Sequence, residues 1–222
     1  MNFFSIFNNF FCLWFTLAQE KIIFVKINAS NFHMKILHTA DWHLGQVFCG
    51  YDRTEEEHDM LQQIREIVSE EKPDAMVVSG DIYNTGSPSP TAQKMYNDAI
   101  LDIHLACPEM TIVIISGNHD MGRGTSFEEL ESPVNEHYLH NKYIDIPGTN
   151  WRIIGHNGWY DYLFAEGIDP EEVATFRRGF YYDRIIEQPM SDPERMDLGL
   201  QQMNILLDDA KAANKQVIFM TH

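Results

Sequence analysis

The feature that most constrains this chain is a series of four apolar runs, each of which ends in side chains that bind metal ions. The runs are ILHTADWHLG at 36–45, AMVVSGD at 75–81, TIVIISGNHD at 111–120 and QVIFMTH at 216–222. An apolar run of this length, rich in β-branched residues, predicts a buried strand of a parallel or mixed sheet. The polar residues would then emerge together at the carboxyl ends of the strands, where open α/β sheets bind ligands.

The side chains at these strand ends are carboxylates, an amide and imidazoles: Asp41, His43, Asp81, Asn118, His119 and His222. Donors of these kinds suit Mn²⁺, Fe or Zn²⁺, and no cysteine takes part. A single D-x-H is weak evidence, because a lone Asp or His near a strand end is more often a capping or hydrogen-bonding residue. The ordered series D-x-H, G-D, G-N-H-D and T-H, each after an apolar run, favours one metal centre instead.

In these motifs the chain resembles the calcineurin-like metallophosphoesterase family. The resemblance implies an α/β fold, a two-sheet sandwich flanked by helices, with a centre of two divalent metal ions. Mn²⁺ is the favoured metal, with Fe or Zn²⁺ as alternatives. Asp81 is the candidate for the carboxylate that bridges the two ions. By the family pattern, Asp41 and His43 would bind one ion. Asn118 and His222 would bind the other.

The family pattern leaves His119 outside this ligand set. As an imidazolium, His119 would stabilise or protonate the departing oxygen of a phosphate ester. Asp120 is expected to orient the His119 ring, as carboxylates behind such histidines commonly do. Two cations roughly 3.5–4 Å apart can generate a hydroxide and hold an in-line displacement at phosphorus, so the whole set predicts a metal-dependent phosphoesterase. The glycines before Asp81 and Asn118 fit sharp strand-to-loop turns.

The finer resemblance divides at the GNHD motif. Residues 34–120, with GYDRTEEEH and VVSGDIYNTGSPSP, resemble the SbcD family of nuclease subunits, which implies DNA as the substrate and an SbcC-like ATPase as the partner. Residues 121–222, with SFEEL and FYYDRIIEQPMSDPERMD, resemble a family of small bacterial phosphoesterases, which implies a small phosphate ester. The metal chemistry is common to both families, so the substrate stays open.

The family pattern also places a G-H-x-H element downstream of the T-H motif, and this sequence ends at His222. We therefore expect a C-terminally incomplete fold in which each metal ion lacks one protein ligand. Three functional hypotheses follow. The leading one is a DNA exonuclease or endonuclease of the SbcD type, the second is a phosphoesterase for a small ester, and the third is an inactive truncated remnant.

The formal net charge of −17 argues against a broad basic face for non-specific DNA contact. It weighs less against a nuclease subunit, because bound divalent cations offset local acidity and a partner can supply basic surface. The three cysteines are scattered and form no C-x-x-C, so they indicate neither a disulfide framework nor a zinc ribbon. A reducing cytoplasm fits this pattern.

Residues 34–222 are expected to form one metallophosphoesterase domain, since a chain of this length and 44% hydrophobic content can bury a sizeable core. Residues 1–33 begin with an aromatic-rich apolar run that is too short to span a bilayer and lacks a basic segment in front. We expect an N-terminal extension outside the fold, with Met34 as the natural start. An export signal is the alternative, and no membrane partner is expected.

Helices are predicted between the apolar runs. Thr54 and Glu57 match a capping box, and Ser89-Pro90 and Asp192-Pro193 are typical openings of two further helices. Residues 121–150 contain Gly, Pro and Asn and predict a loop-rich segment.

Two further features after the third motif bear on the site. His156 follows a strand-like run and is a candidate for the metal cleft. Trp159, Tyr160 and Tyr162 are more often core residues at such a place, with stacking on a base or sugar as the alternative.

Overall fold

The computed structural model describes residues 22–29, 32–121, 138–163, 167–169, 171–173, 175, 179 and 182–222. The apolar run at the N-terminus and most of the segment after the GNHD motif lie outside the described residues. The strands are β1 (Ile22–Ala29), β2 (Phe32–Thr39), β3 (Val47–Phe48), β4 (Tyr51–Asp52), β5 (Ala75–Ser79), β6 (Thr111–Ile115), β7 (Lys142–Asp145), β8 (Trp151–Gly155) and β9 (Gln216–Met220). The helices are α1 (Thr54–Glu71), α2 (Pro90–Ala106), α5 (Asp192–Ala212) and the short 3₁₀ turns η2 (Asn118–Asp120) and η3 (Tyr182–Ile185).

Two sheets pack face to face, as the sequence predicts. The first has the strand order β1-β2-β5-β6 and the second has the order β7-β8-β9. In each sheet the outer pair (β1 with β2, β7 with β8) is antiparallel and the remaining pairs are parallel. The apolar residues between the sheets form one cluster: Met34, Ile36, Ala75, Val77, Val113 and Ile115 from the first sheet side, and Ile146, Trp151, Ile153, Ile218 and Met220 from the second.

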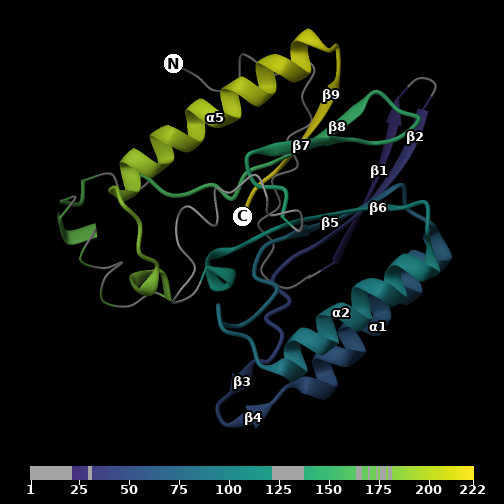
Figure 1. Ribbon diagram of the computed structural model, residues 1–222, viewed down its shortest axis with the longest axis horizontal. Coiled ribbons are helices and arrows are strands. Elements are labelled where there is room, and N and C mark those ends of the chain that lie inside the picture. The colour runs from purple at the N-terminus through teal and green to yellow at the C-terminus, as the bar shows by residue number, and fades with distance from the viewer. Residues whose placement is uncertain are drawn as a thin grey trace.

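Helices cover the outer faces of both sheets, so the molecule has four layers (Figure 1). The side chains that alternate with the inter-sheet residues, such as Leu37 and Met76, pack against α1 and α2. On the other side, Ile154 and Val217 pack against α5 through Ala210. All residues of β5 and β8 are buried, as expected for strands that are covered on both faces.

The predicted helix openings are largely confirmed. Ser89 caps α2, where its hydroxyl accepts a hydrogen bond from the main-chain N–H of Ala92 at 3.1 Å. Helix α5 begins at Asp192, and Ser191 forms a capping box with Glu194 in front of it.

The capping box predicted for α1 is wrong. Arg53 stands at the cap position with no side-chain cap, and the Glu57 carboxylate turns to the loop after β2. There it accepts hydrogen bonds from the N–H groups of Gly45, at 2.9 Å, and Gln46, at 3.0 Å. Glu57 is only 5% exposed. It therefore fastens the first motif loop to α1 instead of capping its own helix.

Two strands depart from the sequence expectations. Strand β1 comes from the segment expected to lie outside the fold, yet it pairs with β2 along its whole length, from Ile22 opposite Thr39 to Ala29 opposite Phe32. Its IIFVKINA sequence is rich in β-branched residues, and the free edge of β2 offers it hydrogen-bonding groups. Strand β7 lies within the segment expected to be loop-rich and pairs with β8. Among the described residues, no helix combines the length and the apolar character needed to cross a membrane.

We expect the substitution Glu57→Ala to lower the free energy of unfolding by about 2 kcal/mol, because each N–H left without an acceptor costs roughly 1–3 kcal/mol. Urea denaturation measures this change. The control is Glu55→Ala, which removes the same charge from the same helix turn at an exposed position. An equal effect of the two substitutions would contradict the role of Glu57 as the anchor of the loop.

Candidate metal centre

The six residues named by the strand-end motifs come together at one edge of the two sheets. Asp41 and His43 follow β2, Asp81 follows β5, and Asn118 and His119 lie in η2 after β6. His222 follows β9, which belongs to the other sheet. The ring of His222 nevertheless reaches the first sheet, where Nδ1 donates a hydrogen bond to the main-chain oxygen of Ser79 at 2.9 Å. The site is therefore built where the carboxyl ends of strands from both sheets meet.

Main-chain hydrogen bonds connect the first two motif loops. The N–H of Asp41 donates to the oxygen of Gly80 at 3.2 Å, and that of His43 donates to the oxygen of Asp81 at 2.9 Å. Asp41, His43 and Asp81 have φ values of 56°, 49° and 50°. Such left-handed conformations cost a non-glycine residue on the order of 1–3 kcal/mol and cluster at functional sites. The connected loops hold three candidate ligands in conformations that they would not adopt alone.

The two motif glycines make room for the candidate ligands. A side-chain carbon on Gly80, whose φ is +79°, would lie 2.3 Å from Nδ1 of His222. A side-chain carbon on Gly117 would lie 2.1 Å from Oδ1 of Asp81. Both positions require glycine because the His222 ring and the Asp81 carboxylate pass directly over the backbone.

Asp81 lies at the centre of the cluster and is 4% exposed. It belongs to two groups whose ligand atoms all lie within 4.8 Å of one another: Asp81 with His43 and His119, and Asp81 with Asp41 and His222. Oδ2 of Asp81 lies 3.7 Å from Nε2 of His43, and Oδ1 lies 3.5 Å from Nε2 of His222. A carboxylate with one oxygen toward His43 and the other toward His222 can bridge two cations. The two groups differ from the family pattern, because Asp41 is grouped with His222 and His119 with His43.

The spacing of the donor atoms is close to that of atoms that share a metal ion. Atoms that share one ion at about 2.0–2.2 Å lie roughly 3–3.5 Å from one another. Nε2 of His43 is 3.7 Å from Oδ1 of Asp41, and Nε2 of His222 is 3.3 Å from Oδ1 of Asn118. The Nδ1 proton of His222 is held by the oxygen of Ser79, so Nε2 is the atom available to a metal. Carboxylate, amide and imidazole donors at these distances suit divalent cations.

Electrostatics in the cluster favour a positive charge. Burial lowers the pKa of His222, but the hydrogen bond and charge of Asp81 outweigh it and raise that pKa to about 9. Burial likewise raises the pKa of Asp81, and the contacts with His222 and the N–H of His119 bring it below its ordinary value. Protonated His222 thus compensates the buried carboxylate where a cation would otherwise do so.

His119 lies against the same carboxylate. Its main-chain N–H donates to Oδ1 of Asp81 at 2.9 Å, and its ring meets the ring of His43 edge-on with centroids 4.7 Å apart. Nδ1 of His119 donates to the main-chain oxygen of Asn84 at 2.9 Å. That bond fixes the orientation of the ring and engages Nδ1, so proton exchange with a substrate would use Nε2.

The Asp120 carboxylate has contacts other than those expected. It accepts hydrogen bonds from three main-chain N–H groups, those of Gly117 at 2.9 Å, Tyr83 at 3.0 Å and Ile82 at 3.2 Å. Burial raises the pKa of Asp120 above its ordinary value despite these bonds. The orienting contact to the His119 ring comes from Asn84, whereas Asp120 joins the loop after β5 to the loop after β6.

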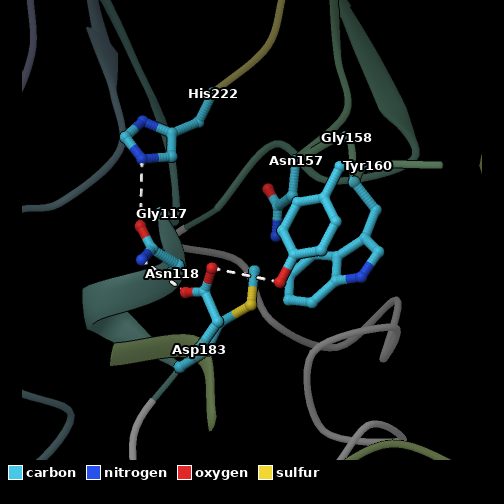
Figure 2. A pocket seen from close by; sticks show the side chains of 9 residues that line it. Gly117, Asn118, Asn157, Gly158, Tyr160, Asp183 and His222 are labelled. Carbon is cyan, nitrogen blue, oxygen red and sulfur yellow. Dashed lines mark hydrogen bonds between the residues drawn. The ribbon is translucent and has the colours of Figure 1, made fainter. Parts of the chain in front are cut away.

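A pocket of about 310 Å³ opens beside the candidate ligands Asn118 and His222. Its other lining residues are Gly117, Met121, Asn157, Gly158, Trp159, Tyr160 and Asp183. Figure 2 shows Asp183 between Asn118 and Tyr160, with hydrogen bonds to both. Asp183 lies in FYYDRII, which contains none of the strand-end motifs, so the metal-ligand pattern did not point to it.

His156 does not line the pocket, although Asn157 and Gly158 next to it do. His156 is 4% exposed, and its Nε2 bonds to Oε1 of Gln202 on α5 at 3.0 Å. Trp159 and Tyr160 do line the pocket, and their rings stack on each other with the ring centroids 5.0 Å apart. Tyr162 bonds instead to Asp192 at the start of α5.

Two curated relatives share substantial identity with part of the chain. The SbcD subunit of the SbcCD nuclease from Rhodobacter capsulatus is 38% identical over 116 residues, which is 52% of this chain and 27% of the relative. The SbcD subunit of the same nuclease from Staphylococcus epidermidis is 43% identical over 89 residues, or 39% of this chain and 23% of the relative. The chain therefore spans about a quarter of the length of these relatives.

Among the solved structures that the chain matches is that of a dimetal phosphatase from Danio rerio. It matches with a TM-score of 0.46 and 14% identity, over 85% of this chain and 69% of the phosphatase. The family model for calcineurin-like phosphoesterases matches residues 34–222, which include every candidate ligand and the strands of both sheets except β1 and the start of β2. This protein belongs to the calcineurin-like phosphoesterase family.

Proposed function

We propose that this chain hydrolyses phosphodiester bonds in DNA with two bound divalent cations, as a nuclease subunit of the SbcD type. The observation that carries the proposal is its 38% and 43% identity to the SbcD subunits of two bacterial SbcCD nucleases. An SbcC-like ATPase subunit as partner and a cytoplasmic location belong to the same proposal. Mn²⁺ is the proposed metal, because the donors are oxygen and imidazole nitrogen atoms without thiolate.

The chain's own residues divide the work as follows. Asp81 directs Oδ2 toward His43 and Oδ1 toward His222, so it would be the ligand shared by the two cations. Asp41 and His43 complete one half. Asn118 and His222 complete the other. When bound, the two cations supply a hydroxide near neutral pH and neutralise charge at the phosphate.

His119 assists the leaving group. Because the oxygen of Asn84 accepts from Nδ1, the proton that His119 exchanges with a substrate is carried on Nε2. The bond from its main-chain N–H to Asp81 keeps the ring beside the candidate metal ligands. A protonated Nε2 beside the site can donate to the oxygen that leaves phosphorus.

A second candidate is a phosphoesterase for a small ester, and the pocket favours it. The pocket volume of about 310 Å³ matches a small molecule, and Trp159 and Tyr160 form an aromatic wall next to two candidate ligands. The net charge of −17 adds weight, because it opposes the approach of a polyanion.

One assay separates the two candidates. The full chain with Mn²⁺ is given a linear DNA duplex with free ends and, in parallel, bis(p-nitrophenyl) phosphate and p-nitrophenyl phosphate. We expect Mn²⁺-dependent release of nucleotides from DNA, enhanced by an SbcC-like ATPase encoded nearby. Turnover of a nitrophenyl ester with no cleavage of DNA, alone or with the ATPase, would establish the small-ester function instead.

Asp81→Asn is expected to abolish hydrolysis and to reduce the number of bound metal ions, because a neutral amide cannot hold two cations close together. The measurements are initial rates and metal content by elemental analysis. Asp98→Asn is the control, since it removes one negative charge at an exposed position on α2. Activity within threefold of the parent chain would refute the bridging assignment.

His119→Ala is expected to lower turnover by about 10²–10⁴, the usual value of general acid-base assistance, with little change in metal affinity. Kinetics and calorimetric titration with Mn²⁺ measure the two effects separately. His58→Ala, at an exposed position on α1, serves as the control. A loss of metal binding as large as that of Asp81→Asn would make His119 a metal ligand.

A further inference from the structure

Asp183 connects a candidate metal ligand to the aromatic wall of the pocket. It lies in η3, 65 positions after Asn118 in the chain, and is 9% exposed. Its Oδ1 accepts a hydrogen bond from Nδ2 of Asn118 at 2.6 Å, and its Oδ2 accepts one from the hydroxyl of Tyr160 at 3.1 Å. Figure 2 shows a series of three hydrogen bonds that links His222 to Asn118, Asn118 to Asp183, and Asp183 to Tyr160.

The direction of the Asn118 amide matters for metal binding. An asparagine side chain has an oxygen end that binds cations and an NH₂ end, nearly equal in size, that repels them. An ionised carboxylate can only accept hydrogen bonds, so Asp183 requires the NH₂ end of Asn118 to face it. The oxygen end then points the other way, toward Nε2 of His222 at 3.3 Å.

Asp183 is itself held in place. The Tyr160 hydroxyl occupies its second oxygen, and the Tyr160 ring stacks on Trp159. The indole N–H of Trp159 donates to Oδ1 of Asp192 at 2.7 Å, which ties this wall to the start of α5. A carboxylate with both oxygens engaged has one orientation, and so does the amide bonded to it.

We propose that Asp183 is a positioning residue that holds the Asn118 amide with its oxygen directed at the metal centre. The role rests on the proposed two-metal function, since Asn118 is a ligand in that scheme. It predicts that the metal affinity of one half of the site depends on a residue that touches no metal. Losses of this kind typically amount to 10–100-fold.

The test is Asp183→Asn in the full chain, because an amide at position 183 accepts or donates and no longer dictates the direction of Asn118. We expect Mn²⁺ affinity, measured by calorimetric titration, to fall about 10-fold or more. Asp161→Asn is the matched control, since it removes the same charge from the loop that carries Tyr160 while its own contact is to the N–H of Leu163. This control is expected to stay within twofold of the parent chain.

A double-mutant cycle separates positioning from simple loss of charge. In an Asn118→Ala background, Asp183→Asn has no amide to misdirect, so we expect no further loss of Mn²⁺ affinity. An equal loss in both backgrounds would show that Asp183 acts only through its charge and would overturn the proposal.

The side-chain NH₂ signals of Asn118 in NMR spectra report the hydrogen bond without any metal. We expect slow exchange with solvent in the parent chain, faster exchange in Asp183→Asn, and an intermediate rate in Tyr160→Phe, which keeps the ring and removes one bond to Asp183. Unchanged exchange of the Asn118 NH₂ protons in Asp183→Asn would overturn the proposal. This result would be decisive even if the variant bound Mn²⁺ poorly, because partial unfolding alone could lower metal affinity. Conversely, the expected changes in exchange and Mn²⁺ affinity in a chain that hydrolyses no ester would support the positioning role and contradict the proposed function.

Discussion

The buried carboxylate of Asp81 is the constraint on which the rest of the site depends. It is 4% exposed, adopts a left-handed backbone conformation, and lies within reach of ligand atoms from three other strand ends. A buried negative charge is costly unless it is compensated. The surrounding architecture supplies that compensation, through the N–H of His119 and the ring of His222. Position 117 must be a glycine, because the Asp81 carboxylate passes directly over it and leaves no room for a side chain.

The same constraint explains why two sheets are needed. Three motif loops lie on the first sheet, whereas His222 arrives on β9 of the second. The inter-sheet apolar cluster positions these edges against each other, and the bond from His222 to Ser79 fixes the final contact. A change in the packing between the sheets is therefore expected to shift His222 relative to the candidate ligands of the first sheet, even when each sheet keeps its own structure.

The strand-end motifs predicted buried strands whose polar ends meet, and the structure does bring these ends together, because apolar runs and metal donors are local signals. The two-sheet sandwich was implied by the family resemblance. The contacts of Glu57, Asp120 and Asp183 could not be predicted, since each acidic side chain bonds to groups from other loops that are distant in the sequence, and no local pattern marks these pairs. Local pairing rules favoured a capping box for Glu57 and a ring contact for Asp120. In the structure, both carboxylates instead accept hydrogen bonds from main-chain N–H groups of neighbouring loops. Strand β1 was missed because its sequence adjoins an apolar run that resembles no part of the domain.

The most direct test of a shared carboxylate between two metal ions is a crystal structure of the full chain grown with Mn²⁺, with anomalous scattering used to locate the metal. We expect two peaks roughly 3.5–4 Å apart. Each peak should lie within bonding distance of a different oxygen of Asp81, one beside Asp41 and His43 and the other beside Asn118 and His222. A single peak on one side of Asp81, or two peaks without Asp81 between them, would contradict this organisation of the site.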